Sequence, residues 1–352
     1  MHCDMTRAGA PLGPIRLAPR FKARSCGGSR LRDRAATEVP TGTIGEAWLL
    51  SDLSQNRGND RTIISEGPHA GRGLHDLIGD DATRLSLLGR AQPAEAESFP
   101  LLLKLLDARE SLSMQAHPGR AAVNAPLKDE LWLVLDCTPD AFVYRGARPG
   151  VTLAEIERGA RDGSILDLVV RHRVKRGDAI MLDSGVCHAL GAGILAAEVQ
   201  TPSDTTYRLW DWERNDPARP LQIAEAIAAM KPTFGMALPP LRHVDLDAPS
   251  ARGVVRIEPL HSSRSFDCEV WVLGAESNTL IACRGVPTLL MPLGAEVSVE
   301  GLSSPLRFGE AVVIPAEGKG YSMTSTTPSS VLVSWPHDPL GGLDSSAGVR
   351  LA

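Results

Sequence analysis

Residues 112–118 read Leu-Ser-Met-Gln-Ala-His-Pro. If this stretch is extended, Gln115 and His117 project from the same face, because strand side chains alternate with a period of two. Glu130 begins the next apolar run along the chain, and His188 follows a turn at residues 183–185. Two imidazoles, one carboxylate and one amide oxygen suit zinc and, less selectively, related divalent metals. The sequence therefore predicts a metal site on the inner face of a β-barrel.

The same residues have a simpler explanation. A single His or Gln is more often a hydrogen-bonded core or surface residue than a ligand, and Gln-x-His is a weaker signal than His-x-His. The spacing alone leaves both interpretations open.

Short apolar runs separated by turn residues dominate the chain from Ser98 onward, and runs of this length are typical of strands. Apolar residues at three- and four-residue spacing predict only a few helices. The predicted strands include residues 99–106, 130–136, 141–144, 179–182, 194–200 and 205–210, and the predicted helices are 74–78, 153–161 and 221–231. We therefore expect a mainly β protein with peripheral helices.

A Pro-rich passage at residues 232–249 separates two sets of short strands. Gly-Asp-Ala-Ile-Met-Leu at 177–182 is echoed by Gly-Glu-Ala-Val-Val-Ile at 309–314, which suggests two copies of one barrel. Only the first copy has a histidine, His188, eleven residues after its glycine. We expect a catalytic metal-binding domain over residues 1–240 and a second domain without metal over 241–352. Residues 1–45 read as irregular chain, with 1–12 disordered.

The composition excludes several classes of partner. The chain has 352 residues and a net charge of −5, so no general positive field would gather nucleic acid or an anionic membrane. It has no apolar stretch of about 20 residues and no signal-peptide core. Its six cysteines show no C-x-x-C spacing, which favours a reducing compartment. We expect a cytoplasmic protein with a small-molecule partner, as a monomer or a dimer.

Two cations fall within predicted strands. Lys104 lies in an apolar run, where a buried charge needs a partner or a ligand. Arg208 shares a strand face with Thr206 and Trp210. Both could bind a phosphate, although Lys104 could instead reach solvent at a strand edge and Arg208 could pair with a nearby carboxylate. Glu198, on a neighbouring strand, is a candidate proton carrier.

Several of these segments together resemble the type I mannose-6-phosphate isomerases. The resemblance runs from about Pro14 to Lys231 and continues more faintly beyond, with Gly-Glu-Ala-Trp at 45–48 as an early marker. It rests on residues 99–108, 113–118, 188–193 and 198–212. Cys26 departs from it, since the bacterial family usually has Trp there, and so does Asp183, where Pro is common. These departures bear on substrate preference more than on chemistry.

The resemblance implies two cupin-type (jelly-roll) β-barrels, one zinc ion per chain, and interconversion of mannose 6-phosphate with fructose 6-phosphate. The family's functional residues can be matched one by one onto this chain. The metal ligands fall on Gln115, His117, Glu130 and His188, the catalytic residues on Arg208, Lys128 and Glu198, and the substrate contacts on Lys104 and Ser113.

Two other functions use the same residues. An iron-dependent cupin oxygenase would use the two histidines and Glu130 as a facial triad, but would leave Lys104, Lys128 and Arg208 without a role. A non-catalytic sugar-phosphate-binding cupin would retain the site for recognition only. Cupin phosphoglucose isomerase chemistry is a nearer variant that differs by substrate.

Overall fold

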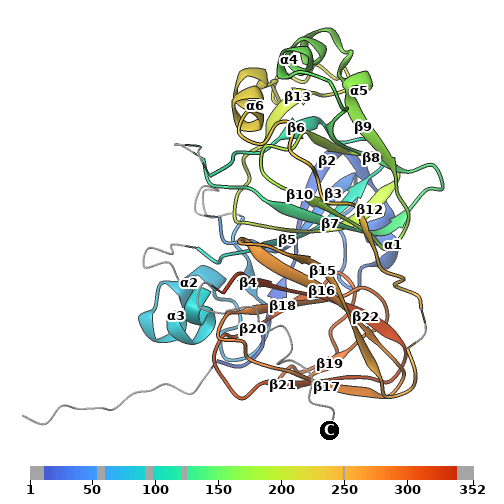
Figure 1. The fold of residues 1–352 in the computed structure, drawn as a ribbon. Helices are drawn as coiled ribbons and strands as arrows, with labels where there is room; N and C mark the ends of the chain where they lie inside the picture. Colours follow the sequence, from blue (N-terminus) through green and yellow to red (C-terminus); the bar gives the residue numbers. More distant parts are fainter. Residues whose placement is uncertain are drawn as a thin grey trace, which may run out of the picture. The chain divides into compact units, whose positions relative to one another are not determined.

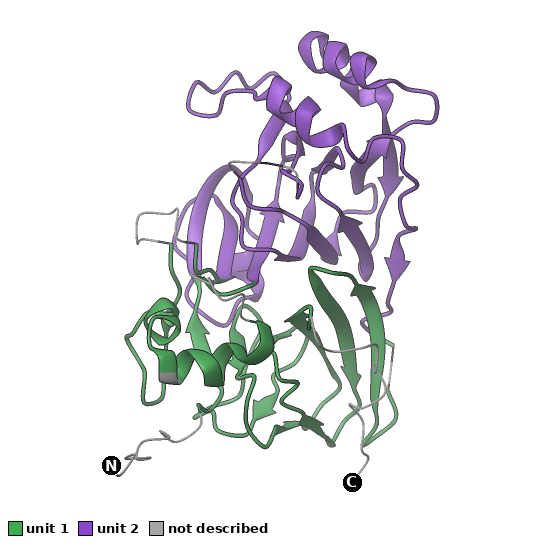
Figure 2. Cartoon of the chain, turned by 60° about the vertical axis from the view of Figure 1, so that its left-hand side comes forward, with its two compact units in different colours: residues 1–19, 50–100, 248–352 green, residues 20–49, 101–247 purple. Residues whose placement is uncertain are grey.

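The computed structural model describes residues 12–53, 60–91, 98–120, 122, 125–248 and 250–338. Strands in antiparallel sheets are the main regular structure of these residues, with few helices beside them, which confirms the predicted mainly β fold (Figure 1). The chain divides into two compact units, each assembled from separate segments (Figure 2). Unit 1 comprises residues 1–19, 50–100 and 248–352, and unit 2 comprises residues 20–49 and 101–247.

Unit 2 contains two antiparallel sheets. The seven-stranded sheet has the order β14-β10-β7-β12-β5-β2-β3, and the five-stranded sheet has the order β13-β6-β11-β8-β9. The strands of the first are β14 Arg242–His243, β10 Asp178–Leu182, β7 Glu130–Cys137, β12 Ile194–Gln200, β5 Leu102–Ala108, β2 Arg20–Gly28 and β3 Ile44–Leu50. Those of the second are β13 Tyr207–Trp210, β6 Met114–Ala116, β11 His188–Leu190, β8 Phe142–Ala147 and β9 Val169–Arg173.

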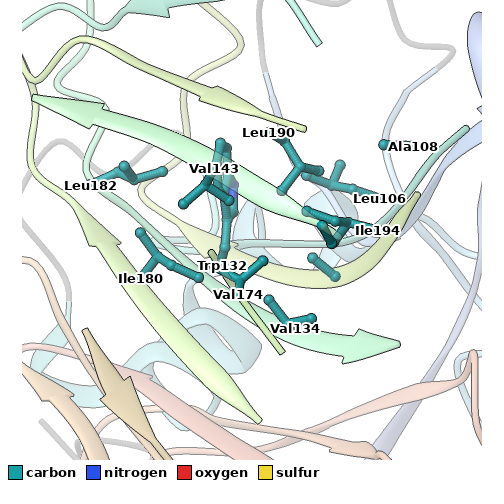
Figure 3. Close-up of a cluster of buried hydrophobic side chains, with 12 residues drawn as sticks. Leu106, Ala108, Trp132, Val134, Val143, Val174, Ile180, Leu182, Leu190 and Ile194 are labelled. Carbon is teal, nitrogen blue, oxygen red and sulfur yellow. The ribbon is translucent and has the colours of Figure 1, made fainter. Parts of the chain in front are cut away.

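An apolar core joins the two sheets of unit 2. Leu182 and Ile180 of β10 and Trp132 of β7 come from the larger sheet, while Val143 of β8 and Leu190 of β11 come from the smaller one (Figure 3). All five side chains are buried. Two residues of the candidate site, Glu130 at the start of β7 and His188 at the start of β11, come from these strands, so the core fixes the strands that carry them.

Three helices cover the other face of the five-stranded sheet (Figure 1). They are α4 Leu153–Asp162, α5 Ile165–Leu168 and α6 Ile223–Met230, and α1 Arg30–Arg34 lies near β5. Helix α4 begins with a capping box in which Thr152 and Glu155 bond each other's backbone N–H. It ends at Gly163, whose φ of 83° is left-handed and therefore favours glycine. The helix therefore spans Leu153–Asp162, one residue longer than the predicted 153–161.

Unit 1 has a seven-stranded sheet in the order β15-β16-β22-β18-β20-β1-β4 and a three-stranded sheet in the order β17-β21-β19. Its helices are α2 Leu74–Ile78, α3 Asp81–Leu88 and the 3-10 turn η1 Gly89–Ala91. The strands are β1 Ile15–Ala18, β4 Ile63–Ile64, β15 Val255–Ser262, β16 Phe266–Leu273, β17 Ser277–Ile281, β18 Thr288–Pro292, β19 Ser298–Val299, β20 Ala311–Ile314, β21 Tyr321–Ser325 and β22 Ser329–Pro336.

The N-terminal region differs from the expectation of irregular chain. Residues 15–34 form β1, β2 and α1, and β3 begins at Ile44. The reading failed because β2 is only partly buried over residues 20–25, so its Arg- and Lys-rich sequence lacks a clear apolar alternation. Residues 1–12 were predicted to be disordered, and all of them except Leu12 lie outside the described residues.

The units also divide the chain differently from the expected boundary near residue 240. Strand β1 pairs with β20, which places an N-terminal strand in the unit that contains the C-terminal sheet. The two similar segments at 177–182 and 309–314 contain β10 and β20. A glycine with a left-handed φ comes shortly before each strand, at 88° for Gly177 and 86° for Gly309. In the described part of the chain, none of the helices has the length and apolar character needed to cross a membrane.

Candidate active site

The two predicted histidine ligands are buried, and their outer ring nitrogens are engaged. His117 Nδ1 lies 3.0 Å from the carbonyl oxygen of Thr205, and His188 Nδ1 lies 2.8 Å from that of Val186. A carbonyl only accepts, so both Nδ1 atoms carry the proton and both Nε2 atoms present a lone pair. Such bonds orient metal-ligating histidines. Both rings therefore have the tautomer that a metal requires.

Glu130 lies between these Nε2 atoms, at the start of β7. Its carboxylate oxygens are 3.1 Å from His188 Nε2, 3.4 Å from His117 Nε2 and 3.0 Å from Lys128 Nζ. The side chain is fully buried, and neither oxygen accepts a hydrogen bond of good geometry. Burial would raise its pKa, but the charge of Lys128, and then the adjacent His117, hold the pKa well below its usual value. The carboxylate is therefore ionised.

These three residues could hold a metal ion, because their ligand atoms all lie within 4.8 Å of one another. Burial, and then the charge of Lys128, lowers the pKa of His117 to about 3, so its imidazole is neutral and can donate its lone pair. The unsatisfied carboxylate oxygens of Glu130 point to the same conclusion, since buried polar atoms rarely lack partners. The donor set fits a divalent metal.

Gln115 joins the group from β6. Its amide nitrogen is 3.3 Å from His188 Nε2, and its Oε1 accepts a hydrogen bond of 3.1 Å from Ser113. The nitrogen and oxygen of an amide can be exchanged by rotating it, so either can face the histidines. Gln115 has a ladder partner on each side: His188 on β11 and Arg208 on β13. The structure therefore brings all four predicted ligands together.

Beside the ligands, β12 carries a buried ion pair. Glu198 and Lys104 are each 4% exposed and lie opposite each other in the β5–β12 ladder, with 3.0 Å between Oε1 and Nζ. Trp132 Nε1 donates to the second oxygen of Glu198 at 2.8 Å, and Lys104 also donates to Gln200 at 2.9 Å. Lys104 is thus in a central strand, not at an edge. Two of its three N–H groups are engaged, which leaves one for a ligand.

A further carboxylate, Glu46 of β3, was not among the predicted site residues. It accepts hydrogen bonds from Arg24 Nε at 2.7 Å and from Trp48 Nε1 at 2.6 Å. Although burial opposes it, the charges of Lys104 and Arg24 lower the pKa of Glu46 to about 2. Lys104 Nζ in turn lies 4.9 Å from the Trp48 ring centroid. The period-two spacing of Glu46 and Trp48 could have suggested this shared face.

Arg208 is half-buried in β13, and its Nε is buried without a hydrogen-bond partner. Over the described residues it forms no ion pair within 4 Å, so the expected alternative of pairing with Asp211 or Glu198 does not occur. Burial, and then the nearby Arg219, lowers its pKa. Arg208 is thus a cation with unused donors, adjacent in the sheet to Gln115.

Comparisons with known proteins agree with this geometry. The family model for the catalytic domain of phosphomannose isomerase type I matches residues 15–131, which include Lys104 to Glu130 of the site. GmuF of Bacillus subtilis (strain 168), described as a probable mannose-6-phosphate isomerase, is 35% identical over 222 residues, or 61% of this chain and 67% of that protein. ManA of the same strain, a mannose-6-phosphate isomerase, is 36% identical over 208 residues, which are 58% of this chain and 62% of that protein.

A solved structure matches over nearly the whole chain. The crystal structure of the mannose 6-phosphate isomerase from Bacillus subtilis has a TM-score of 0.75 and 27% identity, and the match covers 92% of this chain and 99% of that one. This match extends well beyond residues 15–131, the range of the family model. The chain therefore belongs to the type I phosphomannose isomerase family and is an isomerase enzyme.

Proposed function

We propose that the chain is a zinc-dependent isomerase that interconverts mannose 6-phosphate and fructose 6-phosphate. The observation that carries this proposal is the convergence of two buried imidazoles, Gln115 and the unsatisfied Glu130 carboxylate beside a buried cation–carboxylate pair. Zinc, when bound by these four residues, would act as a Lewis acid that polarises the sugar carbonyl. The names of the relatives support the choice of substrate.

The reaction moves one proton between C1 and C2 of the open-chain sugar through an enediol. We assign the proton transfer to Glu198, because its carboxylate is buried and oriented by both Trp132 and Lys104. This is the role that a positioned carboxylate can perform without a large rearrangement.

Two cations can stabilise the negative charge that develops on the sugar oxygens. Lys128 Nζ lies 3.0 Å from Glu130 and 3.1 Å from His117 Nε2, next to the ligands. Arg208 has an unpartnered Nε on the adjacent strand. Fixed donors of this kind stabilise a developing oxyanion. Lys104, through its third N–H group, and Ser113 would bind the phosphate or the sugar hydroxyls.

Deuterium incorporation tests the proposed proton transfer. Zinc-loaded protein is incubated with mannose 6-phosphate in D₂O, and the products are followed by NMR. An enediol route exchanges the transferred hydrogen with solvent, so we expect fructose 6-phosphate labelled at C1. Turnover with no label under prolonged incubation would favour an internal hydride shift and remove Glu198 from this role.

We also place the enzyme in the cytoplasm. The five cysteines among the described residues are all free thiols, which supports a reducing compartment. Fractionation of the source cells checks this assignment.

A further inference from the structure

A pocket of about 920 Å³ lies in unit 2, and none of the residues that line it belongs to the site described above. Its wall is formed by the end of β8, by β9, by residues 185–187 and by the segment that follows α6. Residues 231–241 of that segment contain neither helix nor strand. The pocket therefore has a regular sheet on one side and an irregular segment on the other.

The charge of this pocket is of one sign. Four arginines and one histidine line it, and no aspartate or glutamate does, although the chain as a whole has a net charge of −5. The cationic residues are Arg145, Arg148, Arg171 and Arg173, while burial lowers the pKa of His172 and keeps its ring neutral. Asp183 is the one carboxylate whose charge acts on the pKa of Arg145, which burial lowers. Such a surface favours an anionic ligand.

Arg145 provides a specific binding group in the wall. Its side chain is almost fully buried, with 3% of the residue exposed, and its Nη1 donates to the carbonyl oxygen of Pro239 at 2.7 Å. Its Nε and Nη2 are buried and have no hydrogen-bond partner among the described residues. These two nitrogens form one side of the planar guanidinium, the side that can bind a carboxylate or a phosphate through two parallel hydrogen bonds.

The position of Arg145 is fixed by the five-stranded sheet. Four residues on neighbouring strands form one row across this sheet. Arg145 of β8 pairs with His188 of β11, His188 pairs with Gln115 of β6, and Gln115 pairs with Arg208 of β13. Directly opposed side chains in antiparallel strands share a face. The two arginines therefore flank the two metal ligands at opposite ends of one row. Arg145 is thus a second cationic position, at the opposite end of this row from Arg208.

We propose that this pocket binds a small organic anion, a phosphate ester or a carboxylate, whose charged group bonds the free side of Arg145. Its apolar part would lie against Phe234, Met236 and Leu238, which line the same pocket. Both free nitrogens are covered from solvent, so the anion would reach them by a shift of the irregular segment at 231–241. The proposal is independent of the reaction catalysed at the metal site.

The experiment is isothermal titration calorimetry with inorganic phosphate and, separately, with citrate as probes. The full chain is used with Ser113→Ala in the background, so that anion binding at the substrate site, to which Ser113 contributes, is weakened. We expect one remaining site, with Arg145→Gln lowering its affinity about 10- to 100-fold, the range for losing hydrogen bonds to a charged group. Binding of phosphate or of citrate identifies which anion class the pocket accepts.

A second variant covers the case in which Arg145→Gln does not fold. Arg148→Glu changes an exposed residue of the pocket, so it should fold, and it should weaken binding several-fold by reversing a charge. Arg158→Gln, an exposed arginine of α4 outside the pocket, serves as the matched control and should leave the affinity unchanged. The proposal would be overturned if either pocket variant, Arg145→Gln or Arg148→Glu, bound the probes as tightly as the control does. It would also be overturned if neither phosphate nor citrate bound.

Discussion

Arg208 offers the most direct test at the scale of single residues. Its Nε is buried without a partner beside Gln115, so in the proposed reaction it stabilises charge on a sugar oxygen. Arg208→Ala should lower kcat by more than about tenfold, as the loss of one charge-stabilising donor does. Steady-state kinetics checks this, with equal metal content confirmed for both proteins. Arg161→Ala, on an exposed surface of α4, is the control, and unchanged turnover in Arg208→Ala would exclude a catalytic role.

Glu46 predicts a pH dependence of stability. Its folded pKa of about 2 lies below the ordinary value of 4.5, so the ionised carboxylate stabilises the fold above pH 4.5, and this contribution disappears as the pH falls toward 2. Glu46→Gln should therefore cost stability at pH 7, by at most about 3 kcal/mol at 1.36 kcal/mol per pKa unit. The gap between variant and wild type should close in acid, because protonated Glu46 resembles Gln.

Urea unfolding of the metal-free proteins at several pH values measures that gap. Glu38→Gln, an exposed carboxylate of the same region, is the control. A gap that stays constant from pH 7 down to the lowest pH at which both proteins fold would show that the ion pairs with Arg24 and Lys104 do not stabilise the fold.

The sequence was informative about residues wherever a short spacing matched a strand face. Gln115 and His117 could be placed together from their period of two, and the structure brings them to the same site as Glu130 and His188. Glu46 could not be selected in this way, because its partners Arg24 and Lys104 lie on other strands. Cross-strand register, which joins distant segments, is not encoded in local spacing.

At the scale of elements, α4 gives a prediction that separates stability from activity. Its capping box lies outside the residues of the candidate site, so Thr152→Ala should lower the free energy of unfolding by about 1 kcal/mol without changing kcat/KM. Thr152→Ser keeps the oxygen and should remain near wild type. Chemical denaturation and a turnover assay check both parts. A loss of activity at full stability would mean that the helix acts on the site directly.

Elements with strong local signals were predictable, and those with mixed exposure were not. Strand β12 occupies the predicted residues 194–200, because its run of buried residues ends at turn residues on both sides. Helix α4 was also predicted, from the three- and four-residue spacing of its apolar residues. By contrast β2 was missed, since its partly exposed, charged sequence resembles a loop. What decides its structure is its pairing with β3, a tertiary contact.

At the scale of the whole molecule, the interleaved units predict how fragments behave. A fragment of residues 241–352 lacks β1 and β4, which complete the sheet of unit 1 beyond β20. We expect it to show no cooperative unfolding transition when expressed alone, because it exposes the edge and core that β1 covers. Circular dichroism during thermal unfolding checks this, with the full chain as reference. A cooperative transition in the fragment would instead show that residues 241–352 fold without β1 and β4.

In the proposed reaction, zinc bound by the four ligands is required for sugar-phosphate isomerisation. The measurement that tests it most directly is a coupled assay of fructose 6-phosphate formed from mannose 6-phosphate by chelator-treated protein, with and without added zinc. We predict no turnover without metal and recovery with zinc, and no recovery in His188→Ala, which loses one buried ligand. Full turnover without metal, or no turnover by folded, zinc-loaded protein, would contradict the account.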